Sequence, residues 1–194
     1  MSKRECADAE SAAKHLKELL SGTDILKEIC TIRKGQRIAT VNKQIEAYGF
    51  KAVDDNNRLQ TGQLWLLTGR NGDAIKALNA GQSLDIRSEI EYDVGVMYGS
   101  ISGKKVNCPY RKLRESYEEL TFYEVDTDGY LERVFGSISD CDGIVRIMYE
   151  MSREYMAEAL IAYKTGAEYW DFNTSGMDKR SYYRILDMPD ILKK

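Results

Sequence analysis

The clearest pattern of hydrophobic and polar positions in this chain lies between Leu84 and Tyr98. Apolar side chains occupy most even positions over about 15 residues, and charged side chains occupy most of the odd positions between them. Alternation with a period of two is typical of a strand that buries one face, and one-sided sheets are normally antiparallel. We therefore expect a half-buried antiparallel strand here, with its acidic side chains in water: Asp85, Glu89, Glu91 and Asp93.

Shorter segments on both sides of this pattern also predict strands. The apolar run Leu64–Leu67 suits a buried strand and is followed by a turn at 69–72, after which residues 73–80 fit either a short helix ended by Gly81 or the return arm of a hairpin. Residues 106–110 are expected to pair back as an edge strand. A second hairpin is expected from residues 120–125 and 130–138, joined by Asp126–Gly129.

The N-terminal part of the chain shows helical spacing instead. Residues 7–20 predict a helix that stops at Gly22, and a second helix is expected after the capping residues Thr23 and Asp24, with Ile25, Ile29 and Ile32 on one face. A third helix is expected at 36–48, with Gly49 as its left-handed terminator. A hairpin that turns at 34–36 is the alternative for this last stretch.

Helical spacing returns near the C-terminus, at 142–164 and at 178–187. The order of elements predicts an α+β fold, in which an antiparallel, meander-like sheet from the central third is packed by N-terminal and C-terminal helices. A length of 194 residues suits a single globular domain over 1–194 that is helical in 1–50, strand-rich in 58–138 and helical in 140–190.

Composition bears on location and on the kind of partner. The chain has a formal charge of −3, no apolar run long enough to span a bilayer and no apolar segment after its N-terminal charges. Its four cysteines stand far apart, as free thiols do in a reducing compartment. These features predict a soluble, cytoplasmic protein with no membrane contact, and the net negative charge disfavours nucleic acid as a partner.

No complete catalytic or metal-binding set is present in the sequence. His15 is the single histidine, and although Ser11 and Glu18 lie within reach on the same helical face, that face is expected to be solvated. The acidic strings at 126–129 and 140–143 lack the glycine and glutamate spacing of a calcium loop. Cys108, which precedes several basic residues, is the best candidate for a reactive thiol. We assign no catalytic residue, metal or cofactor, and the sequence favours a non-enzymatic protein.

Two groups of charged residues are candidate binding surfaces. Acidic residues dominate between 115 and 142, and their proposed partner-binding members are Glu118, Glu119, Asp126 and Asp128. Basic residues gather just before them, and the candidate anion-binding residues are Arg70, Lys104, Lys105, Arg111 and Arg114.

These observations lead to one main functional hypothesis. The chain has 13 tyrosines against 4 phenylalanines, and tyrosine is enriched at binding surfaces. Together with the segregated charge, this favours an intracellular interaction protein, such as a regulator or inhibitor, that binds a larger protein partner. The alternatives are a binder or hydrolase of a phosphate-containing small molecule such as a nucleotide, and a subunit of a homo-oligomer. No stretch matches a family motif.

Overall fold

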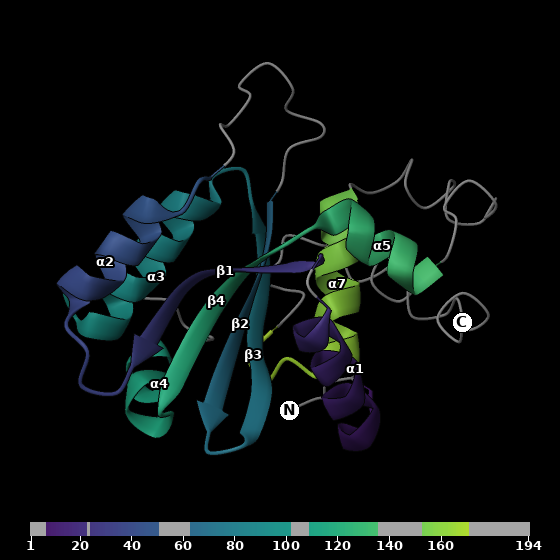
Figure 1. Ribbon diagram of the computed structural model, residues 1–194, viewed down its shortest axis with the longest axis horizontal. Helices are drawn as coiled ribbons and strands as arrows, with labels where there is room; N and C mark the ends of the chain where they lie inside the picture. The colour runs from purple at the N-terminus through teal and green to yellow at the C-terminus, as the bar shows by residue number, and fades with distance from the viewer. Residues whose placement is uncertain (1–6, 23, 51–62, 102–108, 136–152, 171–194) are drawn as a thin grey trace.

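The fold is built on one four-stranded antiparallel sheet. The computed structural model describes residues 7–22, 24–50, 63–101, 109–135 and 153–170 (Figure 1). The strands are β1 (Leu26–Arg33), β2 (Gln63–Asn71), β3 (Ala74–Ser83) and β4 (Glu119–Val125). The described helices are α1 (Ala9–Ser21), α2 (Ile38–Ala47), α3 (Ile86–Tyr98), α4 (Tyr110–Ser116), α5 (Thr127–Phe135) and α7 (Arg153–Thr165).

The strands lie in the order β1-β4-β2-β3, and every neighbouring pair is antiparallel. The predicted α+β class is therefore confirmed, with helices from both ends of the chain packed on the sheet. Only β2 and β3 are neighbours both in sequence and in space, so the order departs from a consecutive meander. Their tight turn depends on Gly72, whose positive φ of 56° is accessible to glycine at little cost.

Helices cover the sheet from both sides (Figure 1). Helices α1, α5 and α7 pack on one face, and α2, α3 and α4 pack on the other. Strand β2 contributes to both cores, because Leu64 and Leu66 point into the first and Trp65 and Leu67 into the second. Burial on both faces explains why this strand reads as a continuous apolar run.

Several predicted elements are confirmed with small shifts in their bounds. The first predicted helix is α1, the third is α2, and the segment after the Gly72 turn is the return arm of a hairpin, β3. The predicted strand at 120–125 is β4, and the described end of the helix at 142–164 is α7. Gly49 is not a left-handed terminator, since α2 ends at Tyr48 in an extended conformation.

The predicted strand between Leu84 and Tyr98 is wrong, because this segment is helix α3. Ile86, Ile90 and Val94 are spaced by four, a spacing that satisfies both a period of two and a helical repeat. The ends of the segment decide between the two. Asp85 accepts a hydrogen bond from the Ser88 amide at 3.0 Å, and Gly99 closes the helix in the left-handed conformation at φ 72°.

The acidic residues assigned to the solvated face of that strand take other places. Asp85 caps α3, and Glu91 forms an i,i+4 ion pair with Arg87 at 2.8 Å. Asp93 is fully buried in the interior. The continuous acidic strand face expected from the alternation therefore does not exist.

The predicted second helix, after Thr23 and Asp24, is strand β1. A β-bulge at Ile29 adds one residue to the strand, so that Ile29, Cys30 and Ile32 all face the same core while Ile25 packs in the other. Because of the extra residue, Ile29 and Ile32 share one face although they are three residues apart. Together with Ile25, four residues before Ile29, they show the spacing of a helical stripe.

The predicted return strand at 130–138 is wrong over its described part, which belongs to α5. Asp126 begins this helix, since its carbonyl accepts the Tyr130 amide at 2.8 Å, and Tyr130, Leu131 and Val134 are buried at helical spacing. The expected edge strand at 106–110 ends in Tyr110, which starts α4, and its first part lies outside the described residues. The predicted helix at 178–187 and residues 142–152 also lie outside them.

Both edges of the sheet are partly closed by the chain itself. On β1, the Gln44 side chain bonds both main-chain groups of Thr31, accepting from its N–H at 3.0 Å and donating to its carbonyl at 3.1 Å. On β3, the amides of Glu168 and Tyr169 donate to the carbonyls of Ala77 and Leu78. Such contacts occupy main-chain groups that would otherwise pair with another chain.

Replacement of Gln44 by alanine is expected to lower the free energy of unfolding by about 1–2 kcal/mol, because the Thr31 main chain loses both partners. Urea denaturation at neutral pH measures the change. Asn42→Ala, at an exposed position on the same helix, is the matched control and should leave the midpoint nearly unchanged. Equal midpoints for the two variants would show that the Gln44 clamp contributes nothing to stability.

Candidate functional site

The face of the sheet on which α1 and α7 pack is not apolar throughout. It carries a core over β3 and the first half of β2, and polar side chains over β1, β4 and the second half of β2. Helices α1 and α7 pack on β3, and α7 also reaches β2. The helices that pack on β1 and β4, α2 and α4, do so from the opposite side. The side chains that β1, β4 and the second half of β2 turn toward the α1 side of the sheet therefore form the candidate binding surface.

The strand register arranges these side chains in three rows that run across the strands. The first row is Arg33, Glu119 and Arg70; the second is Thr31, Thr121 and Thr68; and the third begins with Glu28 and Tyr123. We call these eight residues the polar sheet face. In the third row β2 contributes Leu66, which belongs to the core under α7, so the polar sheet face ends where that core begins.

The second row is a ladder of threonine hydroxyls. The Thr31 hydroxyl donates to Glu28 Oε1 at 2.7 Å and lies 3.1 Å from the Thr121 hydroxyl. Because Thr31 has a single hydroxyl hydrogen and Glu28 accepts it, Thr121 is the donor between the two threonines. All three threonines are buried, at 3–4% exposure, beneath the longer side chains of the neighbouring rows. The ladder thus forms a buried floor in which the hydroxyls of Thr31 and Thr121 are held in place.

The first row is a charged triad. Glu119 receives Arg33 at 3.2 Å on one carboxylate oxygen and Arg70 at 3.1 Å on the other. The hydrogen bond from Arg70 is the main cause that lowers the pKa of Glu119, and the charge of Arg33 adds to it. The arginine side chains are 67% and 43% exposed, so each guanidinium keeps donors directed at solvent.

Tyr123 lies at the centre of the third row. Its phenol is within hydrogen-bonding reach of the Thr121 and Thr68 hydroxyls. Burial raises the pKa of Tyr123, and the charge of Glu28 on the neighbouring strand raises it further. The phenol therefore stays protonated at neutral pH and offers a partly exposed aromatic surface.

The four candidate acidic residues do not form one surface. Glu118 and Glu119 stand at the start of β4, whereas Asp126 and Asp128 stand past its end, at the beginning of α5. Since the strand rises about 3.3 Å per residue, roughly 20 Å separates the two pairs. Glu118 also has a local role, because its carboxylate accepts the Gly72 amide of the β2–β3 turn at 3.0 Å.

The candidate basic residues are also separated. Arg70 belongs to the charged triad, whereas Arg111 and Arg114 lie near the last carbonyls of α3, those of Val96 and Met97, at 3.4 Å each. Arg114 also stacks over the Tyr98 ring at 4.2 Å. Cations at this position complement the negative end of a helix dipole. Lys104 and Lys105 lie outside the described residues.

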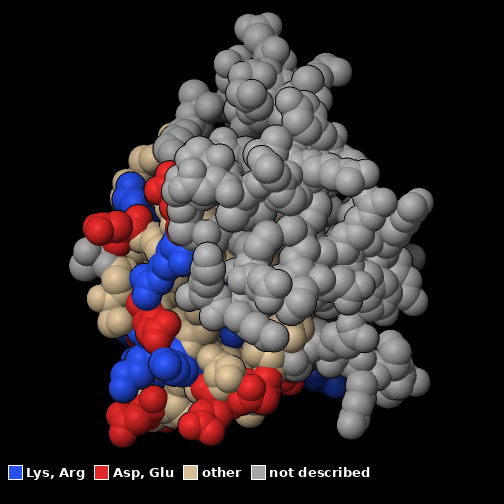
Figure 2. Space-filling model, turned by 90° about the vertical axis from the view of Figure 1, so that its right-hand side faces the viewer, with Lys and Arg blue, Asp and Glu red and all other residues tan. Residues whose placement is uncertain are grey.

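Charge is mixed rather than segregated on the described surface. In the part that Figure 2 shows in colour, blue and red side chains alternate, and neither sign forms a continuous field. The same mixing holds in the polar sheet face, whose two arginines balance its two glutamates. The expectation of separate acidic and basic surfaces is not met there.

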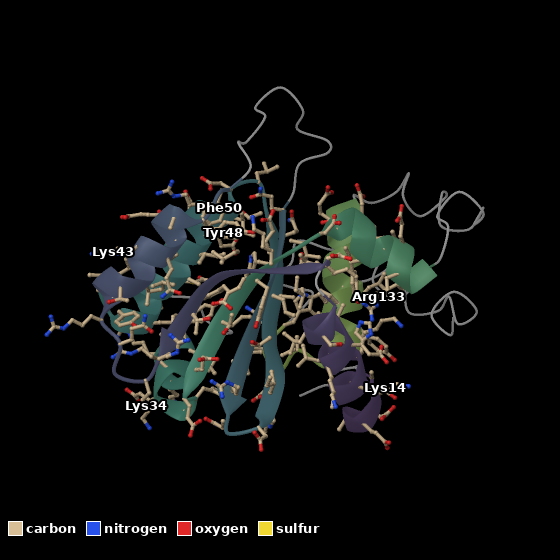
Figure 3. All side chains as sticks on the ribbon, viewed as in Figure 1. Lys14, Lys34, Lys43, Tyr48, Phe50 and Arg133 are labelled. Carbon is tan, nitrogen blue, oxygen red and sulfur yellow. The ribbon has the colours of Figure 1, made fainter. Side chains whose placement is uncertain are left out.

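A second group of partly exposed aromatic residues is occupied by contacts among its own members and their neighbours. Tyr48 and Phe50 lie together beyond the end of α2, with ring centroids 4.7 Å apart (Figure 3). The Tyr48 hydroxyl donates to Glu124, and the Lys27 ammonium lies 4.5 Å from the Tyr48 ring centre. These contacts already use the polar groups of this cluster, so it is a weaker candidate for ligand recognition than the polar sheet face.

Among the described residues, the remaining candidates from the sequence do not come together as a catalytic set. The expected solvated setting of His15 is wrong: the ring is half-buried against Tyr130, with its Nε2 atom 3.2 Å from the phenol oxygen, and burial lowers the pKa of His15 to about 4. Cys108 lies outside the described residues, and Cys30 is buried. Over the described ranges no cluster of three potential metal ligands occurs, and none of the helices there could cross a bilayer.

Comparison with known proteins adds no functional information, because no family model, no curated protein and no solved structure matches this chain.

The charged triad predicts a pH-dependent contribution to stability. Because the folded state lowers the pKa of Glu119, its contribution is present above the unfolded value of about 4.5 and is lost as the pH falls through the folded value. Glu119→Gln is therefore expected to destabilise the protein at pH 7 by at most about 1 kcal/mol, since both arginines are well exposed. As the pH falls below 4.5 and through the lowered pKa of the folded state, the variant and the wild type should converge.

Urea midpoints measured between pH 3 and 7 test this expectation. Glu132→Gln, at an exposed position on α5, serves as the control and should follow the wild type throughout. A constant gap between wild type and Glu119→Gln down to pH 3 would show that the carboxylate charge is not what the arginines stabilise.

Proposed function

We propose that this protein is a non-enzymatic interaction protein that binds a protein partner through the polar sheet face. The observation that supports the proposal most directly is the arrangement of Tyr123, Arg33 and Arg70 over an ordered threonine floor. Tyrosine and arginine are the residues most enriched at protein interfaces, and a rigid sheet presents them with little loss of conformational entropy on binding.

The charge balance of this surface favours a protein partner over a polyanion. Two guanidinium groups and two carboxylates cancel within the polar sheet face, whereas binding to nucleic acid requires an excess of positive charge. The charge is nevertheless uneven, because two arginines share one carboxylate in the first row and Glu28 stands alone in the third. A complementary partner presents a carboxylate opposite Arg33 and Arg70 and a hydrogen-bond donor opposite Glu28.

Binding or hydrolysis of a phosphate-containing molecule has less support. Of the residues proposed for it, Arg70 is paired with Glu119, and Arg111 and Arg114 lie at the end of α3. Self-association through the same surface is the other alternative and is an outcome of the experiment below. The cytoplasmic setting that we propose for the interaction rests on the sequence, chiefly on the wide spacing of the cysteines.

The proposal is tested by site-specific photo-crosslinking in the native host. A photoreactive phenylalanine analogue at position 123 is expected to capture a discrete protein, and the same analogue at position 43, on α2, is the control. Lys43 lies on a helix that packs against the opposite side of the sheet (Figure 3). The captured protein is then purified and its affinity is measured by calorimetry.

Arg33→Glu combined with Arg70→Glu is expected to weaken binding of that protein by at least about tenfold, since the double change places like charge opposite the partner's carboxylate. Lys43→Glu makes the same kind of charge reversal on α2 and should leave the affinity unchanged. Capture of the protein's own chain would favour the homo-oligomer. Equal capture from positions 123 and 43 would show that the polar sheet face is not the partner-binding surface.

A further inference from the structure

A second feature, independent of the polar sheet face, lies at the other edge of the sheet. After α7 the chain reverses at Gly166, whose φ is 64°, and residues Ala167–Trp170 then run along β3. We call these four residues the strap. The Glu168 amide donates to the Ala77 carbonyl at 3.2 Å, and the Tyr169 amide donates to the Leu78 carbonyl at 2.7 Å.

The strap lies over the edge of the sheet as a turn rather than as a paired strand. Tyr169 packs against the core beneath α3, and Trp170 packs against the core beneath α7. Consecutive side chains therefore enter opposite layers, and the two amide hydrogen bonds lie between them. The strap covers the part of β3 that would otherwise be open to pairing.

One side-chain hydrogen bond ties the strap to α7. The Trp170 indole N–H donates to Glu158 Oε1 at 2.8 Å. Glu158 is only 2% exposed, and its second oxygen has no hydrogen-bond partner although it is buried. A buried carboxylate with an unsatisfied oxygen is costly in the ionised form and much less so when protonated.

The charged surroundings of Glu158 oppose ionisation. From α3, Glu89 adds a like charge, while the hydrogen bond from the Trp170 indole of the strap and, more weakly, the nearby main chain of Gln82 on β3 partly offset the effect of burial on the pKa. Burial is the largest cause and raises the pKa of Glu158 to about 8. Two charged groups on the other helices packed on α7, Glu18 of α1 and Arg133 of α5, shift the pKa of His15. Neither is among the causes that shift the pKa of Glu158. Glu154, also buried, lies one turn earlier on α7 itself.

We propose that Glu158 is a proton-dependent latch that holds the strap on the edge of β3 when its carboxyl group is protonated and weakens that hold when the group ionises. Opening of the strap hydrates the carboxylate, lets water screen it from Glu89 and frees the carbonyls of Ala77 and Leu78. The latch thereby links protonation to the exposure of a strand edge.

The direction of the pH effect follows from linkage. The carboxyl binds its proton more tightly in the closed state than in an open, hydrated state, whose pKa is near the ordinary value of 4.5. The closed state is therefore most favoured below about pH 4.5 and loses stability up to about pH 8, by at most about tenfold per pH unit in the opening constant.

Amide hydrogen exchange on the full chain tests the latch. Protection factors, corrected for the intrinsic pH dependence of exchange, are measured between about pH 5.5 and 7.5 for Glu168 and Tyr169 and for the β2–β4 ladder. The two strap amides are expected to lose about five- to tenfold in protection per pH unit. The ladder amides, which exchange on global unfolding, should lose less protection per pH unit. Global unfolding also exposes His15, whose lowered pKa makes the folded state gain stability as the pH rises. Equal losses in the strap and the ladder would show that the strap does not open separately and would overturn the proposal.

Three variants assign the effect to Glu158. In Glu158→Gln the pH dependence of the strap amides should disappear, whereas Glu154→Gln should keep the wild-type slope. Trp170→Phe keeps an aromatic ring but removes the indole donor, so it should lower the protection of the strap amides at every pH. This variant tests the contact independently, should Glu158→Gln fail to fold. A slope that persists in Glu158→Gln, or that is lost in Glu154→Gln, contradicts the latch, as does unchanged protection in Trp170→Phe.

Discussion

The registered pairing of β1, β4 and β2 is the constraint on which the rest of the structure depends. Because Thr121 lies opposite Thr31 on one side and Thr68 on the other, one face of β4 becomes the middle of three polar rows. A slip of one residue would turn Glu119, Thr121 and Tyr123 into the core beneath α2 and α3. It would also bring Leu120 and Phe122 to the polar side, so the same register that fills the core also assembles the polar sheet face.

The sequence was a good guide wherever local chemistry alone decides the structure. The glycine turn at Gly72, the doubly buried run Leu64–Leu67 and the helical stripe of α2 each contain enough information to identify their element. The failures arose where two periods share the same positions. In α3, residues four apart fit both a strand and a helix, and the deciding signals were the Asp85 cap and Gly99, at the two ends of the segment. In β1 the bulge at Ile29 breaks the period of two, so the apolar positions of a strand show the spacing of a helix.

The candidate site was predictable only in part. Glu119 and Arg70 were both identified, but as members of opposite charged surfaces, whereas they form one ion pair. The sequence does not single out Thr31, Thr68 or Thr121, because one threonine in a strand has no distinctive signal. Their meaning comes from register, which joins residues 31, 68 and 121 across long stretches of chain. Strand order and bulge position set that register, and neither follows from the spacing within any one segment.

The polar sheet face and the surroundings of Glu158 treat buried polar groups in opposite ways, and this contrast separates a binding surface from a switch. In the polar sheet face the buried hydroxyls of Thr31 and Thr121 bond one another, and the arginines of the charged triad stand at the surface where water reaches them. Such a network is satisfied in one arrangement and gains little from moving. Around Glu158 the carboxyl is buried with one oxygen unsatisfied, so closed and open arrangements differ in proton affinity. The first arrangement suits recognition by a rigid surface, and the second suits a contact that solution conditions can release.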